Sequence, residues 1–149
     1  MNPELHYHGS FTLTLDRDHR VRIPVEWRPE AGGTLLLLPA RSFDLPMLKV
    51  MSRSCHEGII AMIREAPTPP ARRQAIAAAF MAMSHETAVG PHGKLRIPKP
   101  LCEKAALEPG GEVVVAGAGD HFMIWNPANF ETMCELATDA LDDDNLGIL

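Results

Sequence analysis

The sequence predicts an α+β domain built from two tandem copies of one small β-rich unit. Arg22-Ile23-Pro24 recurs 74 residues later as Arg96-Ile97-Pro98, and the match extends in register to Arg20 and Lys94. Short stretches that alternate apolar and polar residues, which is typical of half-buried strands, follow in the same order in both copies. Two units that each bury one face favour a single fused domain with pseudo-two-fold symmetry.

The first copy is predicted to contain four strands and a helix. Residues 10–15 alternate as a strand, residues 16–19 form a polar turn, and a second strand at 20–23 ends at Pro24, because proline cannot donate to a sheet. The remaining elements are a strand at 34–38, a turn at 41–44, a strand at 47–51, and a helix from a cap at Ser54 to about Arg64.

The second copy repeats this order after a connecting helix. A proline-rich breaker at 67–70 precedes a helix at 71–83, whose Arg72 and Arg73 are interpreted as a solvated first turn. The second copy then has a turn at 90–93, a strand at 95–98, a helix at 101–106, a turn at 109–111, strands at 112–116 and 121–125, and a helix at 128–136 capped by Asn126. The predicted organisation is a first repeat at 5–66, a connecting helix at 67–83, a second repeat at 84–136 and an acidic tail at 137–149.

The composition favours a globular protein and offers no metal or catalytic constellation. Of 149 residues, 46% are hydrophobic and 22% are charged, and no stretch approaches the roughly 18 apolar residues of a membrane helix. The first eight residues do not resemble a signal peptide, so a cytoplasmic protein without a membrane partner is expected.

The three cysteines form no Cys-x-x-Cys pair, and only His6 and His8 share a strand face, so no metal or cofactor is expected. Without a nucleophile elbow, phosphate loop or spaced carboxylate pair, neither catalysis nor a small-molecule substrate is expected.

The net charge of −5 argues against a nucleic-acid partner until its distribution is considered. From Glu131 to the C-terminus there are six acidic residues and no Lys or Arg. The remainder, residues 1–130, holds 13 acids against 14 bases and is close to neutral. The acidity therefore belongs largely to the tail, which is interpreted as a solvated end.

Basic residues recur at the same place in both copies. Arg20 and Arg22 lie on one face of the first predicted strand, and Lys94 and Arg96 repeat this arrangement. Such a pair of basic strands fits the β-ribbons that enter a DNA groove, and Asp16 is expected to orient Arg20 or to cap the turn. A purely solvated polar face is the alternative. The candidate double-stranded DNA contacts are Arg17, His19, Arg20, Arg22, His92, Lys94, Arg96 and Lys99.

The segment from Asp16 to Pro24 resembles the Asp-x-x-x-Arg motif and following strand of MraZ proteins, within the wider AbrB-like (SpoVT-AbrB) group. The order of segments continues to resemble that family through the helix after Trp125, so that the resemblance covers about residues 5–136. It implies a tandem-repeat swapped-hairpin β-barrel with short peripheral helices, and homo-oligomerisation, expected as a ring. It further implies a nucleoid-associated transcriptional regulator that binds repeated short DNA boxes upstream of the division and cell-wall gene cluster.

The sequence departs from the family pattern mainly in its second copy. Gly90 stands where the motif has Asp, Lys94 stands where it has Arg, and in the first copy His19 replaces the usual Gly. A lysine keeps the charge but lacks the fork with which arginine makes two parallel contacts. An AbrB-like antitoxin, or an oligomeric interaction protein with weak or no DNA binding, therefore stays open as the alternative function.

Overall fold

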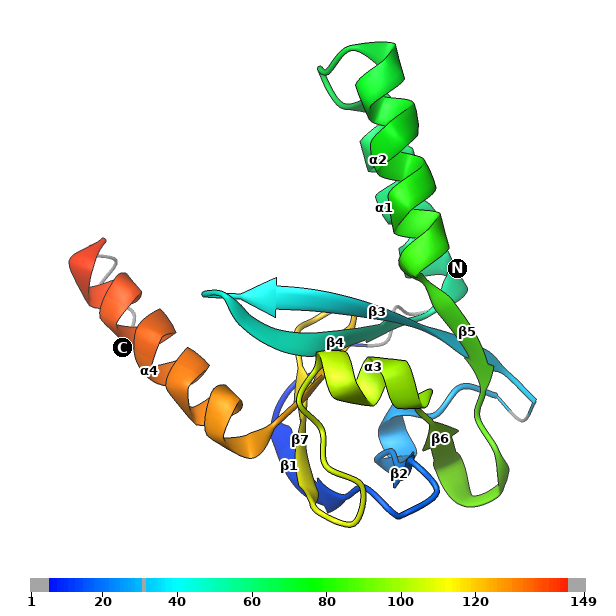
Figure 1. The fold of residues 1–149 in the computed structure, drawn as a ribbon, viewed down its shortest axis with the longest axis vertical. Coiled ribbons are helices and arrows are strands. Elements are labelled where there is room, and N and C mark those ends of the chain that lie inside the picture. The colour runs from blue at the N-terminus through cyan, green and yellow to red at the C-terminus, as the bar shows by residue number, and fades with distance from the viewer. Residues whose placement is uncertain (1–5, 31, 145–149) are drawn as a thin grey trace.

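The computed structural model describes residues 6–30 and 32–144, and within these ranges it confirms the α+β class (Figure 1). The described chain forms a six-stranded antiparallel sheet, a separate two-stranded ribbon and four α-helices. The sheet has the strand order β1-β7-β8-β4-β3-β5 and comprises β1 (Ser10–Thr14), β7 (Glu112–Gly117), β8 (Phe122–Trp125), β4 (Leu45–Met51), β3 (Thr34–Ser42) and β5 (His85–Ala88). Its two end strands, β1 and β5, do not pair with each other among the described residues, so the sheet is open.

The ribbon consists of β2 (Arg20–Arg22) and β6 (Lys94–Arg96), one short strand from each half of the chain. Its central pair is Val21 with Leu95, and the central pair between β4 and β8 is Lys49 with Met123. Both pairs join residues that are 74 apart, the offset of the sequence repeat. The outer pairings also cross between the halves, because β1 pairs with β7 and β5 pairs with β3.

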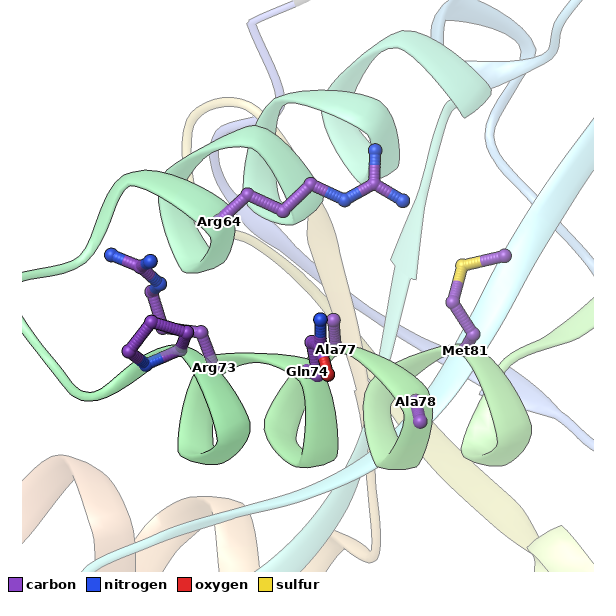
Figure 2. Close-up of a pocket in the computed structure, with 7 residues that line it drawn as sticks. Arg64, Arg73, Gln74, Ala77, Ala78 and Met81 are labelled. Atoms are coloured by element: carbon purple, nitrogen blue, oxygen red, sulfur yellow. The ribbon is translucent and has the colours of Figure 1, made fainter.

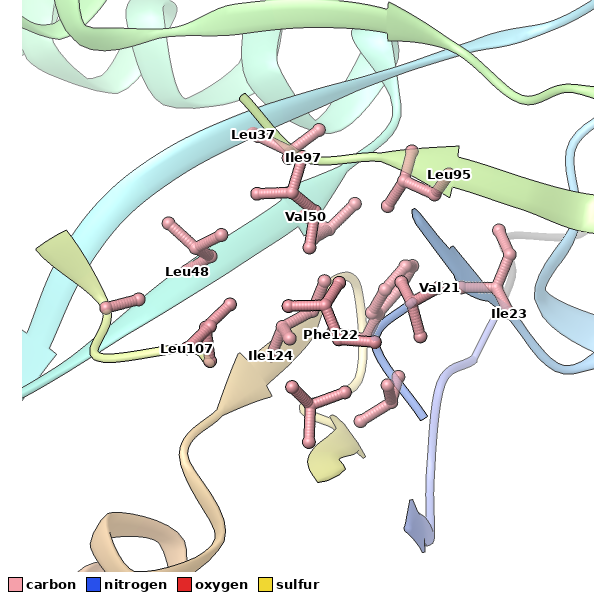
Figure 3. Packing of buried hydrophobic residues seen from close by; sticks show 14 of the residues in the cluster. Val21, Ile23, Leu37, Leu48, Val50, Leu95, Ile97, Leu107, Phe122 and Ile124 are labelled. Atoms are coloured by element: carbon pink, nitrogen blue, oxygen red, sulfur yellow. The ribbon is translucent and has the colours of Figure 1, made fainter. Parts of the chain in front are cut away.

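The core lies between the ribbon and one face of the sheet (Figure 3). Val21, Ile23, Leu95 and Ile97 are fully buried and face side chains of the sheet such as Phe122. Burying an apolar side chain of this size stabilises the fold by roughly 1.5–3 kcal/mol. The same alternation that buries these four residues places the intervening basic side chains on the outer face of the ribbon.

Two helical projections leave the sheet in different directions (Figure 1). The first is a hairpin of α1 (Arg53–Glu65) and α2 (Pro70–Met83), which pack against each other. The second is α4 (Pro127–Asp143), whose first turns cover a smaller cluster on the outer face of the sheet that includes the fully buried Trp125. The short α3 (Lys99–Lys104) lies beside the ribbon, and no helix among the described residues is both long and apolar enough to cross a bilayer.

Several predicted boundaries in the first copy were wrong. β3 and β4 run to a two-residue turn at Phe43 and Asp44, both with positive φ (51° and 62°), and not to a turn at 41–44. α1 is capped by Ser52 and not by Ser54, since the Ser52 side chain accepts a hydrogen bond from the Cys55 N–H at 3.1 Å. The 3-10 turn η1 (Val25–Trp27) that follows the first ribbon strand was not anticipated.

The second copy differs from its prediction in three places. β5 was missed, because its residues do not alternate between apolar and polar. α3 begins at Lys99 and ends at Lys104, two residues earlier at each end than predicted. α4 continues seven residues beyond Leu136 to Asp143, so that most of the segment interpreted as an acidic tail is helical.

Candidate nucleic-acid interface

Four basic side chains share the outer face of the β2–β6 ribbon. Arg20 lies directly opposite Arg96, and Arg22 lies directly opposite Lys94. Arg22 and Arg96 are exposed, whereas Arg20 and Lys94 are half-buried. Residues opposite each other on one face of an antiparallel pair are close together, and like charges there are destabilising. We call these four residues the basic ribbon face.

The turn before β2 is held by the carboxylate of Asp16. This carboxylate accepts hydrogen bonds from the backbone N–H groups of Asp18 and Arg20, both at 2.9 Å, and from Nε of Arg20 at 3.2 Å. The backbone bond from Arg20 contributes most to lowering the pKa of Asp16, and the bond from Asp18 and the charge of Arg20 lower it further. Asp18 also binds Arg20, through an Nη2–Oδ2 distance of 3.2 Å, so two carboxylates fix the direction of this guanidinium.

The turn before β6 shares backbone hydrogen bonds with the turn before β2 but has no carboxylate, and it differs at His92, which has a positive φ (61°). The Asp16 N–H donates to the Arg20 carbonyl at 2.9 Å, and the Gly90 N–H donates to the Lys94 carbonyl at the same distance. His19 (φ 64°) and Gly93 (φ 72°) are in the left-handed conformation at equivalent positions. Lys94 therefore has no counterpart of the Asp16 carboxylate to orient it.

Each turn is hydrogen-bonded to the strand of the other half. The Ile97 N–H donates to the His19 carbonyl at 2.7 Å, and the Ile23 N–H donates to the Gly93 carbonyl at 3.0 Å. The ribbon is thus longer than its two three-residue strands and forms one unit with its turns. A basic face on such a unit is more rigid than one on a free loop.

Arg28 supports the second turn and was missed by the sequence reasoning. Its Nε donates to the Ile23 carbonyl at 3.0 Å, and its side chain lies against Gly93, where an added Cβ would clash with Nε. In the sequence, Arg28 is simply a basic residue after Trp27, and this pattern does not indicate which turn the side chain contacts. Arg28 therefore acts on the ribbon through the backbone that it packs against.

The other predicted site residues flank the ribbon. His19 and Lys99 line one hollow together with the end of α3, and His92 (φ 61°) and Arg28 line another on the opposite side. Arg17 is exposed and lies near Gly110. Four of the eight predicted contacts thus gather on the basic ribbon face, and the remaining four lie in or next to its turns.

The arrangement is suited to binding an extended polyanion. Four cations on a narrow two-stranded element can contact successive phosphates, and a ribbon of this kind fits the major groove of B-DNA. Residues 6–30 and 32–144 contain no group of three or more His, Cys, Asp or Glu side chains that could hold a metal ion.

Comparison with known proteins points to one family. The chain is 30% identical over 118 residues to a protein of Thermus thermophilus, covering 79% of this chain and 80% of that protein. It is 26% identical over 141 residues to a protein of Leuconostoc mesenteroides, covering 95% of each chain, and 29% identical over 123 residues to one of Hyphomonas neptunium, covering 82% of this chain and 73% of that protein. All three relatives are named transcriptional regulator MraZ.

No family model matches the chain. A solution structure from Pyrococcus horikoshii resembles it with a TM-score of 0.38 at 18% identity, covering 84% of this chain and 100% of that one.

Proposed function

This chain belongs to the MraZ family of transcriptional regulators, and from that premise we propose that it regulates transcription by binding double-stranded DNA through the basic ribbon face. The observation that carries the proposal is the pairing of Arg20 with Arg96 and of Arg22 with Lys94. Like charges placed directly opposite each other cost stability in the free protein. Asp16 and Asp18 offset this cost at Arg20, whereas no ion pair with a described residue offsets it at Arg22, Lys94 or Arg96. A polyanion bound across them removes that cost, because each phosphate neutralises a cation.

We propose that the two halves are tandem swapped-hairpin repeats related by a pseudo-two-fold axis. Three observations support this relation: the central pairs of the ribbon and of β4 with β8 are both 74 residues apart, the two ribbon turns share their hydrogen bonds, and α1 and α4 are capped at equivalent positions. The axis would pass through the ribbon and would place the two turns symmetrically about the bound groove.

We further propose that the DNA sites are repeated short boxes upstream of the division and cell-wall gene cluster, and that copies of the chain assemble into a ring to engage them. One copy offers few cations, and its net charge is −5. Several linked copies bind a row of boxes with an effective concentration that one copy cannot reach. This function would place the protein at the nucleoid, in the cytoplasm.

The test is binding to DNA from upstream of the gene for this chain. Fluorescence anisotropy at about 0.15 M salt should show binding to the native repeats at least tenfold tighter than to a shuffled duplex of the same length and composition. The variant Arg22→Ala with Arg96→Ala should lose at least tenfold in affinity, since two exposed cations are removed. A matched control, Arg41→Ala with Arg72→Ala, removes the same charge away from the ribbon and should bind as the wild type does. Equal binding of native and shuffled DNA would favour the alternative of an interaction protein without specific DNA binding.

A further inference from the structure

Helices α1 and α4 occupy equivalent places in the two halves, but within the described part of the chain only α1 has a helix packed along it. Each follows the last strand of its half, and the side chains of Ser52 and Asn126 cap them through bonds of 3.1 and 3.2 Å. α2 packs along α1, where the ring of His56 stacks on Phe80 with centroids 4.7 Å apart. The corresponding side of α4 has no packed helix among the described residues.

A single pair of equivalent positions shows the difference. Ile60 lies one turn beyond His56, on the same side of α1, and is only 8% exposed. The residue 74 positions later in α4 is Cys134, and its side chain is exposed. The second half therefore leaves open, along α4, the place that a helix fills in the first half.

This open side of α4 is hollowed and acidic. Cys134, Glu135, Thr138 and Asp139 line a hollow along it. The sequence contains no Lys or Arg after Lys104, and within the described ranges neither Glu135 nor Asp139 forms an ion pair. We call these four residues the acidic face of α4.

The helical hairpin carries a groove of the opposite character (Figure 2). Ala77, Ala78 and Met81 of α2 provide small and apolar surface, and Arg64 and Arg73 lie towards the tip of the hairpin. Met81 is 55% exposed, and neither arginine forms an ion pair with another described residue. Small side chains let a second helix approach closely. The two arginines carry positive charge, which is complementary to the negative charge of the acidic face.

We propose that the acidic face of α4 docks into the groove of the α1–α2 hairpin of a second copy, with Glu135 and Asp139 against Arg64 and Arg73. The hairpin and α4 leave the sheet in different directions, so α4 does not cover the groove of its own chain (Figure 1). The contact joins two different surfaces, and such head-to-tail contacts close into rings or extend into filaments. Pairing of α4 with α4 would instead bring acidic faces together, which like-charge repulsion opposes.

This inference rests on the proposed self-association and not on DNA binding. Its tests are therefore measured without DNA. An assembly that forms as described but binds no DNA would contradict the proposed function alone, and a monomer that binds DNA would contradict this inference alone.

The first test is the mass of charge-reversed variants by light scattering and native mass spectrometry. Arg64→Glu with Arg73→Glu should weaken assembly roughly a hundredfold, because each cation then faces a like charge. Glu135→Arg with Asp139→Arg should do the same. The single reversals Arg72→Glu and Asp142→Arg, outside the groove and the acidic face, should assemble as the wild type does. Circular dichroism and thermal melting identify any variant that fails to fold.

The second test is to mix the two double variants. Each retains one intact surface, and the two reversed surfaces are complementary in charge, so an equimolar mixture should regain assembly with the two variants alternating. A mixture that stays monomeric, or a groove variant that keeps the wild-type mass, would overturn the proposal.

Cross-linking provides a measurement that does not depend on charge. Ala77→Cys places a thiol in the groove opposite the native Cys134 of another copy, and a mild oxidant should then link copies covalently. Ala79→Cys, on the same helix but outside the groove, is the matched control with the same other cysteines. Equal cross-linking of the two variants would also overturn the proposal.

Discussion

Asp16 accounts for the main chemical difference between the two ribbon turns. Its carboxylate receives two backbone N–H groups and the Arg20 guanidinium, whereas Gly90 at the equivalent position offers no side chain. The backbone hydrogen bonds of the turns are nevertheless the same, with N–H to carbonyl distances of 2.9 Å at both Asp16 and Gly90. The hydrogen bonds shared by the two turns therefore form with or without a carboxylate, and in the first turn Asp16 adds two backbone contacts and directs Arg20.

This asymmetry predicts that Arg20→Ala weakens DNA binding more than Lys94→Ala. Arg20 is already oriented and loses less conformational freedom on binding, and its planar fork can make two parallel contacts that a lysine cannot. Each variant that removes a phosphate contact should also flatten the slope of log affinity against log salt by roughly one unit. Titrations at four salt concentrations measure both quantities. Equal losses at the two positions would show that the carboxylate has no consequence for binding.

The lowered pKa of Asp16 predicts a pH dependence of stability. A carboxyl group with a depressed pKa in the folded state stabilises the fold above its unfolded value of about 3.9, and this contribution is lost as the pH falls through the folded value. The wild type should therefore exceed Asp16→Asn in free energy of unfolding by a constant amount from pH 5 to 7, and the difference should shrink below about pH 4. Urea unfolding at a series of pH values measures this, with Asp142→Asn as the control. A difference that stays constant down to pH 3 would contradict the role of the charged carboxylate.

The periodicity of apolar residues correctly predicted the strands that face the core. The ends of those strands, which depend on turn residues, were predicted less accurately. Val21, Ile23, Leu95 and Ile97 are fully buried, as their alternation with basic residues indicates. The β3–β4 turn was misplaced because Phe43 and Asp44 adopt positive φ without the Asn-Gly pair that usually marks such a turn.

The helix α4 was predicted too short for a different reason. The sequence after Leu136 was interpreted as a solvated tail because its charged residues are all acidic. Acidic residues near a helix C-terminus also interact unfavourably with the helix dipole. The helix nevertheless continues through Ala137, Ala140 and Leu141, which extend one face of it beyond the sheet. Residues that favour helix formation outweigh the dipole at this end.

The two equivalent helix caps, Asn126 and Ser52, differ in the contacts that they make. Asn126 both accepts the Asn129 N–H and donates from Nδ2 to the Ala106 carbonyl at 2.9 Å, so it ties α4 to the segment after α3. Ser52 only caps α1, through the Cys55 N–H. Asn126→Ala should therefore lower the free energy of unfolding by about 2 kcal/mol and Ser52→Ala by about 1 kcal/mol. Urea unfolding of the two variants checks the order, and a larger loss at Ser52 would contradict it.

For the whole molecule, the repeat was visible in the sequence but the pairing between the halves was not. The offset of 74 residues predicted which side chains correspond, and the ribbon brings Val21 against Leu95 at that offset. Which strands cross between the halves depends on contacts far apart in sequence, such as β1 with β7, and no local pattern carries that information. The gathering of Arg20, Arg22, Lys94 and Arg96 could be anticipated, whereas the support from Arg28 could not.

One copy has few cations on the ribbon and a net charge of −5, which predicts that tight DNA binding requires several boxes. Linking identical sites makes the later contacts intramolecular, and this can raise affinity by about 10² to 10⁴ without a new kind of contact. Duplexes with one, two and four boxes, at fixed length and salt, should therefore bind with steeply increasing affinity to protein of known mass. The charge-reversed variant Glu135→Arg with Asp139→Arg should bind one box as the wild type does and lose the gain on four boxes. If one box binds as tightly as four, each copy acts independently.

Because the two halves are fused into one chain and differ in sequence, the ribbon would contact DNA asymmetrically. A dimer of identical chains presents the same side chains on either side of its axis and is matched to palindromes. Here Asp16 and Arg20 lie on one side of the ribbon centre and Gly90 and Lys94 on the other, so turning the chain end for end on the groove changes the contacts. In the proposed complex, a protein built in this way would distinguish a box from its reverse complement. Boxes arranged head to tail would then orient every bound copy alike, pointing along the promoter towards or away from the gene.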